Sequence, residues 1–339
     1  MKDTSIEWEI VMGLEIHAQL NLRSKLFGPE GYQFGHEPNT DIGIVSTGQP
    51  GTLPVLNEEA IQKAVLLGCA LKSEIALFSR FDRKSYFYPD CPKNFQITQY
   101  DYPILKGGMI EAEVEGQLRS FPIDHVHIEE DAGTLKHFTN FSGVDYNRAG
   151  IGLLEIVSEP CFHTAAEACG YAMAMKDLLD YLNICDVHMD QGSFRMDLNI
   201  SIKPKGEKGL RPKTEIKNMN SFHFMKMAIE QEVERQKQFY TLYPDKRLKL
   251  CTFRFDTSQL KIILMREKEE AADYRYAPEP DLPPIFLTQE EIDAIACTMP
   301  ELPLAKKKRY LQEFQLPEEM ALLFLQNKKL SLYFEKALT

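Results

Sequence analysis

Between residues 8 and 20, the apolar positions recur with a period of two. Every even-numbered position in this stretch is apolar, which is the pattern of a β-strand that turns one face toward a core. The other face presents Glu15, His17 and Gln19 in succession. The pattern therefore predicts a strand that carries a carboxylate, an imidazole and an amide on the side away from the core.

Three later segments repeat this arrangement, with acidic, histidine or arginine side chains opposite an apolar face. They are "DHVHIEEDAG" at 124–133, "GLLEIVSEP" at 152–160 and "SFRMDLNISI" at 193–202. Their polar positions are His125, His127, Glu129, Glu130, Asp131, Glu155, Arg195, Asp197, Asn199 and Ser201. For any single strand a solvated sheet face explains the pattern equally well. Four such strands favour a shared site.

The chemistry of these polar positions indicates a metal. Carboxylates that converge on one face repel one another and must be neutralised by protons or cations. Oxygen ligands with an occasional imidazole suit Mg²⁺ or Mn²⁺ better than zinc or copper. The residues alone therefore predict an antiparallel sheet whose concave face binds a divalent metal and handles phosphate.

Helical signals occupy other parts of the chain. A helix is predicted over 57–72 with Asn57 as its N-cap, and a second begins at Thr164, where Glu167 completes a capping box, and runs to about 183. A third is predicted near 221–240. Four prolines in 277–284 predict a rigid extended connection, after which the composition becomes helical. We place a domain boundary near residue 290 and expect an α+β fold followed by a small all-helical segment.

Bulk composition narrows the class of protein. The chain has 339 residues, 44% of them hydrophobic, and a net charge of −11, which argues against nonspecific coating of nucleic acid. It contains no apolar run of about 18 residues that could span a membrane, and its N-terminus lacks the regions of a signal peptide. Seven scattered cysteines without a C-x-x-C pair predict a reducing, cytoplasmic location. The basic run at 306–309 is interpreted as a solvated face.

Ordered motifs point to one family. The sequence contains, in this order, "GLEIHAQL", "SKLF", "EPNT", "GQPGTLPVLN", "SRFDRKSYFYPDCPKNFQITQ", "HIEEDAG", "VDYNRAG", "LEIVSEP", "GSFRMDLNIS", "TEIKNMNSF" and "DYRYAPEPDLPP". This series resembles the B subunits of aspartyl-tRNA(Asn)/glutamyl-tRNA(Gln) amidotransferases, the GatB family. The resemblance covers residues 8 to about 335. No inserted domain is visible between 160 and 290, which favours this family over the related archaeal E subunits.

The resemblance implies a specific activity. Members of the family act as ligases that use ATP and Mg²⁺ to phosphorylate the side-chain carboxylate of misacylated Glu-tRNA(Gln) or Asp-tRNA(Asn). Ammonia from the glutaminase A subunit then displaces the phosphate, and a C subunit completes the heterotrimer. The implied fold is a glutamine synthetase-like cradle with a mainly antiparallel sheet, here residues 1–290. Residues 291–339 would begin a helical domain that is incomplete, and a tail domain that grips tRNA would be absent.

The resemblance and the strand patterns together assign candidate residues. The candidate catalytic residues are Glu15, His17, Glu130, Glu155, Arg195, Asp197 and Lys217. The candidate metal ligands are Glu15, His17, Glu129, Glu130, Glu155 and Asp197; periodicity favours Glu129 over Glu130, but both are kept because the strand could end there. The candidate nucleotide- or tRNA-binding residues are Lys84, Tyr86, Tyr88, Arg148 and Asn218.

Two departures from the family pattern affect these expectations. Many relatives carry a zinc knuckle, but the four cysteine positions read Gly28, Glu30, Gly43 and Ser46 here, so no zinc is expected. Gln191 stands where relatives commonly have Glu, so one acidic group is missing. A scaffold that binds tRNA or a partner with weakened turnover is therefore the alternative. A ligase for free amino acids is a third and weaker one.

Overall fold

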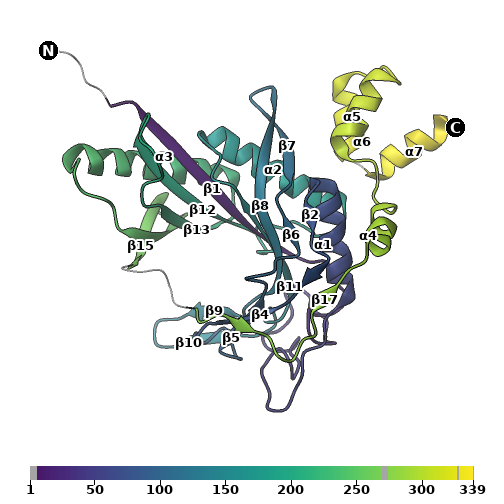
Figure 1. The fold of residues 1–339 in the computed structure, drawn as a ribbon, viewed down its shortest axis with the longest axis horizontal. Coiled ribbons are helices and arrows are strands. Elements are labelled where there is room, and N and C mark those ends of the chain that lie inside the picture. The colour runs from purple at the N-terminus through teal and green to yellow at the C-terminus, as the bar shows by residue number, and fades with distance from the viewer. Residues whose placement is uncertain (1–5, 269–273, 327, 339) are drawn as a thin grey trace.

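A ten-stranded sheet forms the centre of the structure (Figure 1), which is a computed structural model that describes residues 6–268, 274–326 and 328–338. The strand order is β15-β14-β13-β12-β1-β11-β8-β6-β2, and β7 also pairs with β8. Only β13 and β14 pair in parallel; the other pairs of this sheet in the described part of the chain are antiparallel. The expected α+β class with a mainly antiparallel sheet is confirmed.

The bounds of the ten strands follow. They are β1 (Trp8–Gln19), β2 (Glu74–Ile75), β6 (Leu105–Lys106), β7 (Met109–Val114), β8 (Gln117–Glu130), β11 (Gly152–Ser158), β12 (Phe194–Pro204), β13 (Thr214–Met219), β14 (Leu250–Asp256) and β15 (Lys261–Lys268). The four segments singled out by their alternating pattern are β1, β8, β11 and β12, and these strands are consecutive neighbours in the sheet.

One face of the sheet is covered by helices. The even-numbered side chains from Met12 to Ala18 on β1 and from Phe194 to Ile202 on β12 are buried in one hydrophobic core with residues of α2 (Ala165–Tyr181) and α3 (Phe222–Leu242). Figure 1 shows both helices on the same side of the strands. The Thr164–Glu167 capping box is present in the structure. The apolar positions are therefore committed to the core, and the alternating polar positions must face the other way.

Small elements surround the other face. Three further sheets comprise β4 (Asp82–Ser85) with β5 (Phe95–Thr98) and β16 (Ala277–Pro278), β3 (Phe78–Ser79) with β17 (Ile285–Phe286), and β9 (Thr134–His137) with β10 (Ser142–Asp145). Helix α1 (Glu58–Leu71) begins at the predicted N-cap Asn57, whose side chain accepts a hydrogen bond from the Glu59 amide. The proline-rich segment is extended at both ends, but a turn at 280–281 interrupts it.

The last four helices divide between two cores. Helix α4 (Gln289–Ala296) contacts α1, and Ile292 lies in the main core. Helices α5 (Pro303–Gln312), α6 (Glu318–Gln326) and α7 (Lys328–Leu338) surround a second, small core at Tyr310. The domain boundary near 290 stays a prediction, with the main core reaching Leu302. Of the described helices, none has both the length and the apolar character that crossing a bilayer requires.

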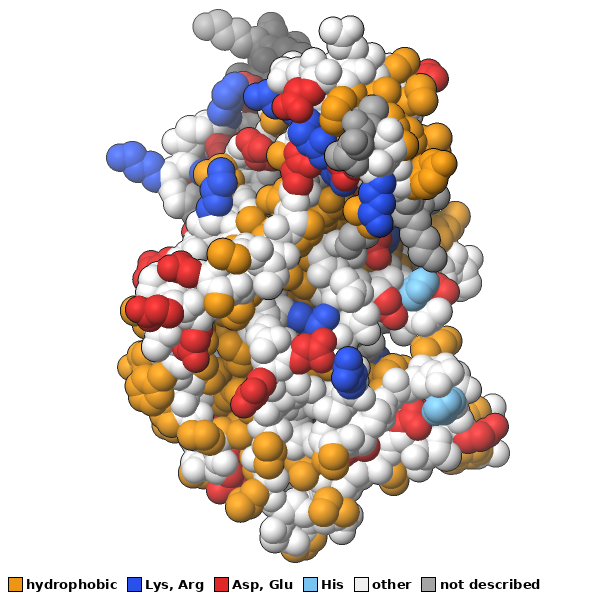
Figure 2. Space-filling view, turned by 90° about the vertical axis from the view of Figure 1, so that its right-hand side faces the viewer, with side chains coloured by type: hydrophobic (Ala, Val, Ile, Leu, Met, Phe, Trp, Pro, Cys, Tyr) orange, Lys and Arg blue, Asp and Glu red, His pale blue; other side chains and the backbone are white. Residues whose placement is uncertain are grey.

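The basic run at 306–309 is paired with acidic side chains. Lys307 forms ion pairs with Glu113 and Glu318, and Arg309 pairs with Glu301 and Glu335. Figure 2 views the molecule from the side of these helices and shows basic and acidic side chains intermixed there. The predicted solvated face is wrong for Lys306, which is buried and lies 3.3 Å from Glu335, and it holds for the exposed Lys308.

Candidate functional site

Strand register brings distant polar residues into rows on one face of the sheet. Arg195, His17, Glu155 and His127 occupy directly opposed positions on β12, β1, β11 and β8. Asp197 opposes Glu15 in the neighbouring row. Directly opposed residues of antiparallel strands project their side chains to the same side of the sheet. The four patterned segments therefore build one surface rather than four separate ones.

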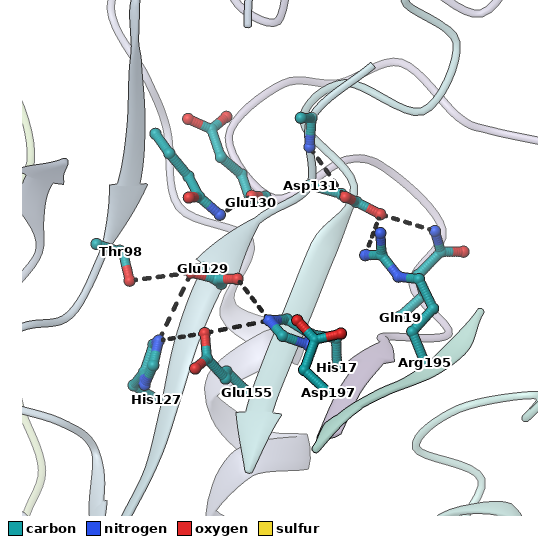
Figure 3. Close-up of polar contacts among 12 residues, drawn as sticks. His17, Gln19, Thr98, His127, Glu129, Glu130, Asp131, Glu155, Arg195 and Asp197 are labelled. Carbon is teal, nitrogen blue, oxygen red and sulfur yellow. Dashed lines mark hydrogen bonds and ion pairs between the residues drawn. The ribbon is translucent and has the colours of Figure 1, made fainter. Parts of the chain in front are cut away.

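The first cluster consists of His17, Glu129 and Glu155, whose potential ligand atoms all lie within 4.8 Å of one another. The Nε2 atom of His17 is 3.3 Å from Oε2 of Glu155 and 3.9 Å from Oε1 of Glu129. The Glu129 carboxylate also accepts a hydrogen bond from the Thr98 hydroxyl. Figure 3 shows these side chains converging from three strands. One imidazole and two carboxylates at this spacing fit a divalent cation of the Mg²⁺ or Mn²⁺ type.

Electrostatics holds the first cluster in a charged state. Burial lowers the pKa of His17, but the carboxylates, Glu155 above all, outweigh burial and raise that pKa to about 9. Burial raises the pKa of Glu155, and the neighbouring His127 and His17 reverse this and hold it well below its ordinary value. Without a cation the site therefore pairs an ionised carboxylate with a protonated imidazole, and His17 would have to lose that proton to bind a metal.

The second cluster consists of Glu15, Asp197 and Glu215, whose oxygens also lie within 4.8 Å of one another. Lys217 Nζ is 2.9 Å from both Asp197 and Glu215, and Asn199 donates a hydrogen bond to Glu15. Burial and the nearby Glu155 raise the pKa of Glu15. Lys217 thus offsets part of the negative charge of three carboxylates that lie beside the first cluster on β1.

Glu130 does not join either cluster. Its carboxylate binds Lys93 Nζ at 2.6 Å and accepts a hydrogen bond from the Ile97 amide at 2.9 Å, and Figure 3 shows it pointing away from Glu129. The strand β8 continues through Glu130, so the period of two holds to its end. The structure therefore brings Glu129 to the site and leaves Glu130 on the opposite side.

Two candidate residues, Arg195 and Arg148, meet at a buried carboxylate. Asp131 is buried and accepts hydrogen bonds from Arg195 at 2.9 Å and from Gln19 at 3.0 Å. Arg148 lies 3.5 Å from the same carboxylate and donates to the carbonyl oxygens of Ala132 and Gly133. The Arg148 guanidinium is therefore occupied by hydrogen bonds to the backbone. Arg195, in contrast, lies beside His17 in the sheet.

Three of the candidate nucleotide- or tRNA-binding residues, Lys84, Tyr86 and Tyr88, lie on β4 and the loop after it. Lys84 Nζ is 4.9 Å from the ring centre of Tyr274; burial opposes the charge of Lys84, but Glu129 and Glu155 raise its pKa. The rings of Tyr86 and Tyr88 are 5.9 Å apart. Lys84 therefore contributes positive charge near the first cluster. The side chain of Asn218 lies outside the described residues.

Three residues of this surface were missing from the sequence-based candidates. Glu215 alternates with Lys217 on β13, which is the signal that could have identified it. His127 was recognised as a polar strand position without a role, yet its Nε2 lies 3.3 Å from Glu155. Asp131 follows the end of β8 and was not separated from its acidic neighbours.

The positions that depart from the family pattern form two local structures. The four former cysteine positions converge, because a Cβ built on Gly28 or Gly43 would lie 2.5 or 2.2 Å from the Glu30 carboxylate, to which Ser46 donates a hydrogen bond of 2.6 Å. The Glu30 side chain therefore fills the centre of its loop.

Gln191 lines a cavity of about 410 Å³ together with Gln19, Tyr32 and Ser193.

Comparisons with known proteins agree on a family. The model of the GatB/GatE catalytic domain matches residues 10–293. The B subunit of the aspartyl/glutamyl-tRNA(Asn/Gln) amidotransferase of Protochlamydia amoebophila is 56% identical over 336 residues, which are 98% of this chain and 68% of the relative. The corresponding B subunits of Chlamydia trachomatis serovar A and Chlamydia pneumoniae are 52% and 53% identical over 335 residues, in each case 98% of this chain and 69% of the relative.

Proposed function

The chain belongs to the GatB/GatE catalytic domain family, and we propose on that premise that it is the carboxylate-activating subunit of a tRNA-dependent amidotransferase. The substrate is Glu-tRNA(Gln), Asp-tRNA(Asn) or both. A side-chain carboxylate oxygen of the substrate attacks the γ-phosphorus of ATP, ADP leaves, and an acyl phosphate forms. Ammonia then attacks the acyl carbon, loses a proton, and inorganic phosphate leaves with the amide in place.

The observation that carries the proposal is the pair of clusters on one sheet face. His17 and Glu15 are two positions apart on β1, so the clusters lie roughly 7 Å apart along the strand. Five carboxylates and an imidazole in that space suit Mg²⁺, which when bound would neutralise the charge that develops in phosphoryl transfer. The donor set fits the cofactors expected from the family, ATP and Mg²⁺.

The remaining charged residues have roles set by their contacts. The charge of Lys84 is stabilised by Glu129 and Glu155 of the first cluster, and we assign this lysine to binding of the triphosphate. Arg195 is held by Asp131 at the edge of the same row, where a bound carboxylate or phosphate could share its donors. Lys217 balances the second cluster. We assign none of these groups a proton-transfer role, since phosphoryl transfer depends mainly on positioning and charge neutralisation.

The expected partners follow from the family. We propose that a glutaminase A subunit supplies ammonia and that a C subunit joins the two in a cytoplasmic heterotrimer. The glutamine synthetase-like cradle is the corresponding fold proposal for residues 1–290, and it is consistent with a large antiparallel sheet that carries its polar residues on one face.

The experiment that tests the proposal is a hydroxylamine trap. The chain, with its A and C partners, is incubated with ATP, Mg²⁺, hydroxylamine and Glu-tRNA(Gln), and the glutamyl γ-hydroxamate is measured. Hydroxamate should depend on ATP and should be lost in Glu15→Gln. The matched control is Glu9→Gln, which changes a carboxylate on the same strand that pairs with Lys203 outside both clusters and should leave the signal intact.

The alternative of a binding scaffold makes a different prediction for the same assay. A scaffold would bind misacylated tRNA but give no hydroxamate under any condition, and Glu15→Gln would change nothing. ATP-dependent hydroxamate with equal yield from Glu15→Gln would contradict the placement of the site instead.

A further inference from the structure

His127 is a second imidazole at the first cluster that has no assigned role. It lies on β8 directly opposite Glu155 on β11, which in turn opposes His17 on β1. Its Nε2 is 3.3 Å from Oε2 of Glu155 and 3.6 Å from Oε2 of Glu129. The two carboxylates therefore lie between two imidazoles, as Figure 3 shows.

The surroundings of the His127 ring identify which nitrogen carries hydrogen. The residue is 8% exposed, and its Nδ1 atom is buried without a hydrogen-bond partner among the described residues. A buried N–H left without an acceptor is costly, whereas both carboxylates face Nε2. Nε2 therefore carries hydrogen both in the neutral tautomer that fits and in the imidazolium, and a nitrogen that carries hydrogen donates to oxygen rather than to a metal.

We propose that His127 is a positioning residue of the first cluster, whose Nε2–H holds the Glu155 and Glu129 carboxylates in place for a divalent cation that His17 helps to bind. The inference rests on the proposed function, since it takes the first cluster to be a metal site. Carboxylate ligands of metals are themselves commonly held by hydrogen bonds, and loss of such a partner typically weakens metal affinity by about 10- to 100-fold. His127 would thus act on the cation through the carboxylates.

The chain supplies a matched control in His125. It lies two positions earlier on β8 and its ring stacks on that of His127, with centroids 5.3 Å apart. Its Nδ1 faces Asp124 at 2.6 Å, and it opposes Val157 rather than an acidic residue. A change at His125 therefore perturbs the same strand and the same ring stack without removing a hydrogen bond to the cluster.

The test measures Mn²⁺ binding to the full chain by electron paramagnetic resonance, in a Glu215→Gln background so that the second cluster is weakened. His127→Ala should raise the dissociation constant about 10- to 100-fold. His127→Gln should stay within about threefold of the parent, because its amide N–H₂ can replace the Nε2 donor. The shorter His127→Asn cannot reach the carboxylates and should resemble the alanine variant. His125→Gln should leave the affinity unchanged.

The possible outcomes distinguish a failure of the role of His127 from a failure of the metal site itself. Binding that is lost in His17→Ala but unchanged in His127→Ala would overturn the role of His127 and keep the metal site. A parent protein that binds no Mn²⁺ would overturn both. Equal weakening by Gln and Asn would exclude the donor role, and this comparison remains informative if the alanine variant does not fold.

Discussion

The Oε2 atom of Glu155 lies 3.3 Å from Nε2 of His17, across the paired strands β1 and β11. The contact joins a carboxylate inside an apolar segment to an imidazole on the N-terminal strand. Glu155 also faces His127 at the same distance. It is therefore the group through which the two histidines are linked, and its charge determines what else the first cluster can hold.

Replacing Glu155 by glutamine should abolish most of the proposed activity. Glu155→Gln keeps the shape of the side chain but removes the charge that would bind a cation, so ATP-dependent hydroxamate should fall by about 100-fold or more. The control is Glu159→Gln, four residues later and exposed, which should retain the parent rate. Full activity of Glu155→Gln would remove the first cluster from the site.

The stability of the metal-free protein should fall with rising pH. A histidine whose pKa is raised by folding stabilises the fold fully below its unfolded-state value of 6.5 and loses that contribution as pH rises through about 9. For His17 the loss amounts to about 3 kcal/mol of unfolding free energy. Denaturant melts in EDTA at pH 6.5 and at pH 9 would measure it.

A His17→Gln variant isolates the contribution of that residue. His127, whose pKa the carboxylates raise to about 10 against the effect of burial, adds a loss of the same sign over the upper part of the range. The pH dependence should therefore become shallower in His17→Gln without disappearing. Identical slopes in the parent and the variant would show that the His17 imidazole is not charged in the fold.

Asp131→Asn should destabilise the protein strongly. Asp131 is buried and holds Arg195 and Gln19, so losing its charge leaves the Arg195 guanidinium without a counter-charge at a partly buried position. Breaking such a pair costs roughly 3 kcal/mol, measurable as a shift in the urea midpoint. Glu7→Gln removes an exposed partner of Lys205 and should leave the midpoint in place, since exposed pairs contribute little.

Purified protein should contain far less than one zinc per chain by elemental analysis, because Glu30 lies where the family's thiolates would converge. A gain of function tests the geometry. Changing Gly28, Glu30, Gly43 and Ser46 together to cysteine removes the central carboxylate and supplies four thiolates, the donor set of a structural zinc site. This variant should bind one Zn²⁺ per chain; stoichiometric zinc in the parent would contradict the expectation.

Local sequence patterns predicted the strands and helices well. Most of what they missed depends on the register between paired strands. The period of two identified β1, β8, β11 and β12, and the caps at Asn57 and Thr164 were readable because each involves neighbours in sequence. That Glu155 would oppose His17 depends on the alignment of two strands far apart in the chain, which alternation does not specify.

Glu130 and Glu215 also show that tertiary structure decides what the sequence pattern leaves open. The choice between Glu129 and Glu130 depended on where β8 ends, and strand ends are set by tertiary contacts such as the Lys93–Glu130 pair. Glu215 enters the second cluster through β13, whose pairing with β12 shifts register near Asp197. No pattern in the sequence marks that shift, so the alternation of Glu215 with Lys217 places both on one face of β13 but does not show which residues of β12 they meet.

The position of β1 between β11 and β12 also sets an order of events during synthesis. Both neighbours emerge from the ribosome long after β1, and the chain must be made as far as Pro204 before both edges of β1 can be paired. Until then an apolar strand with open edges is exposed to aggregation. A sheet that depends on such distant pairings folds slowly, so this chain should need chaperone protection early in its life, and the second cluster, which takes Asp197 from β12, cannot form until β12 has been made.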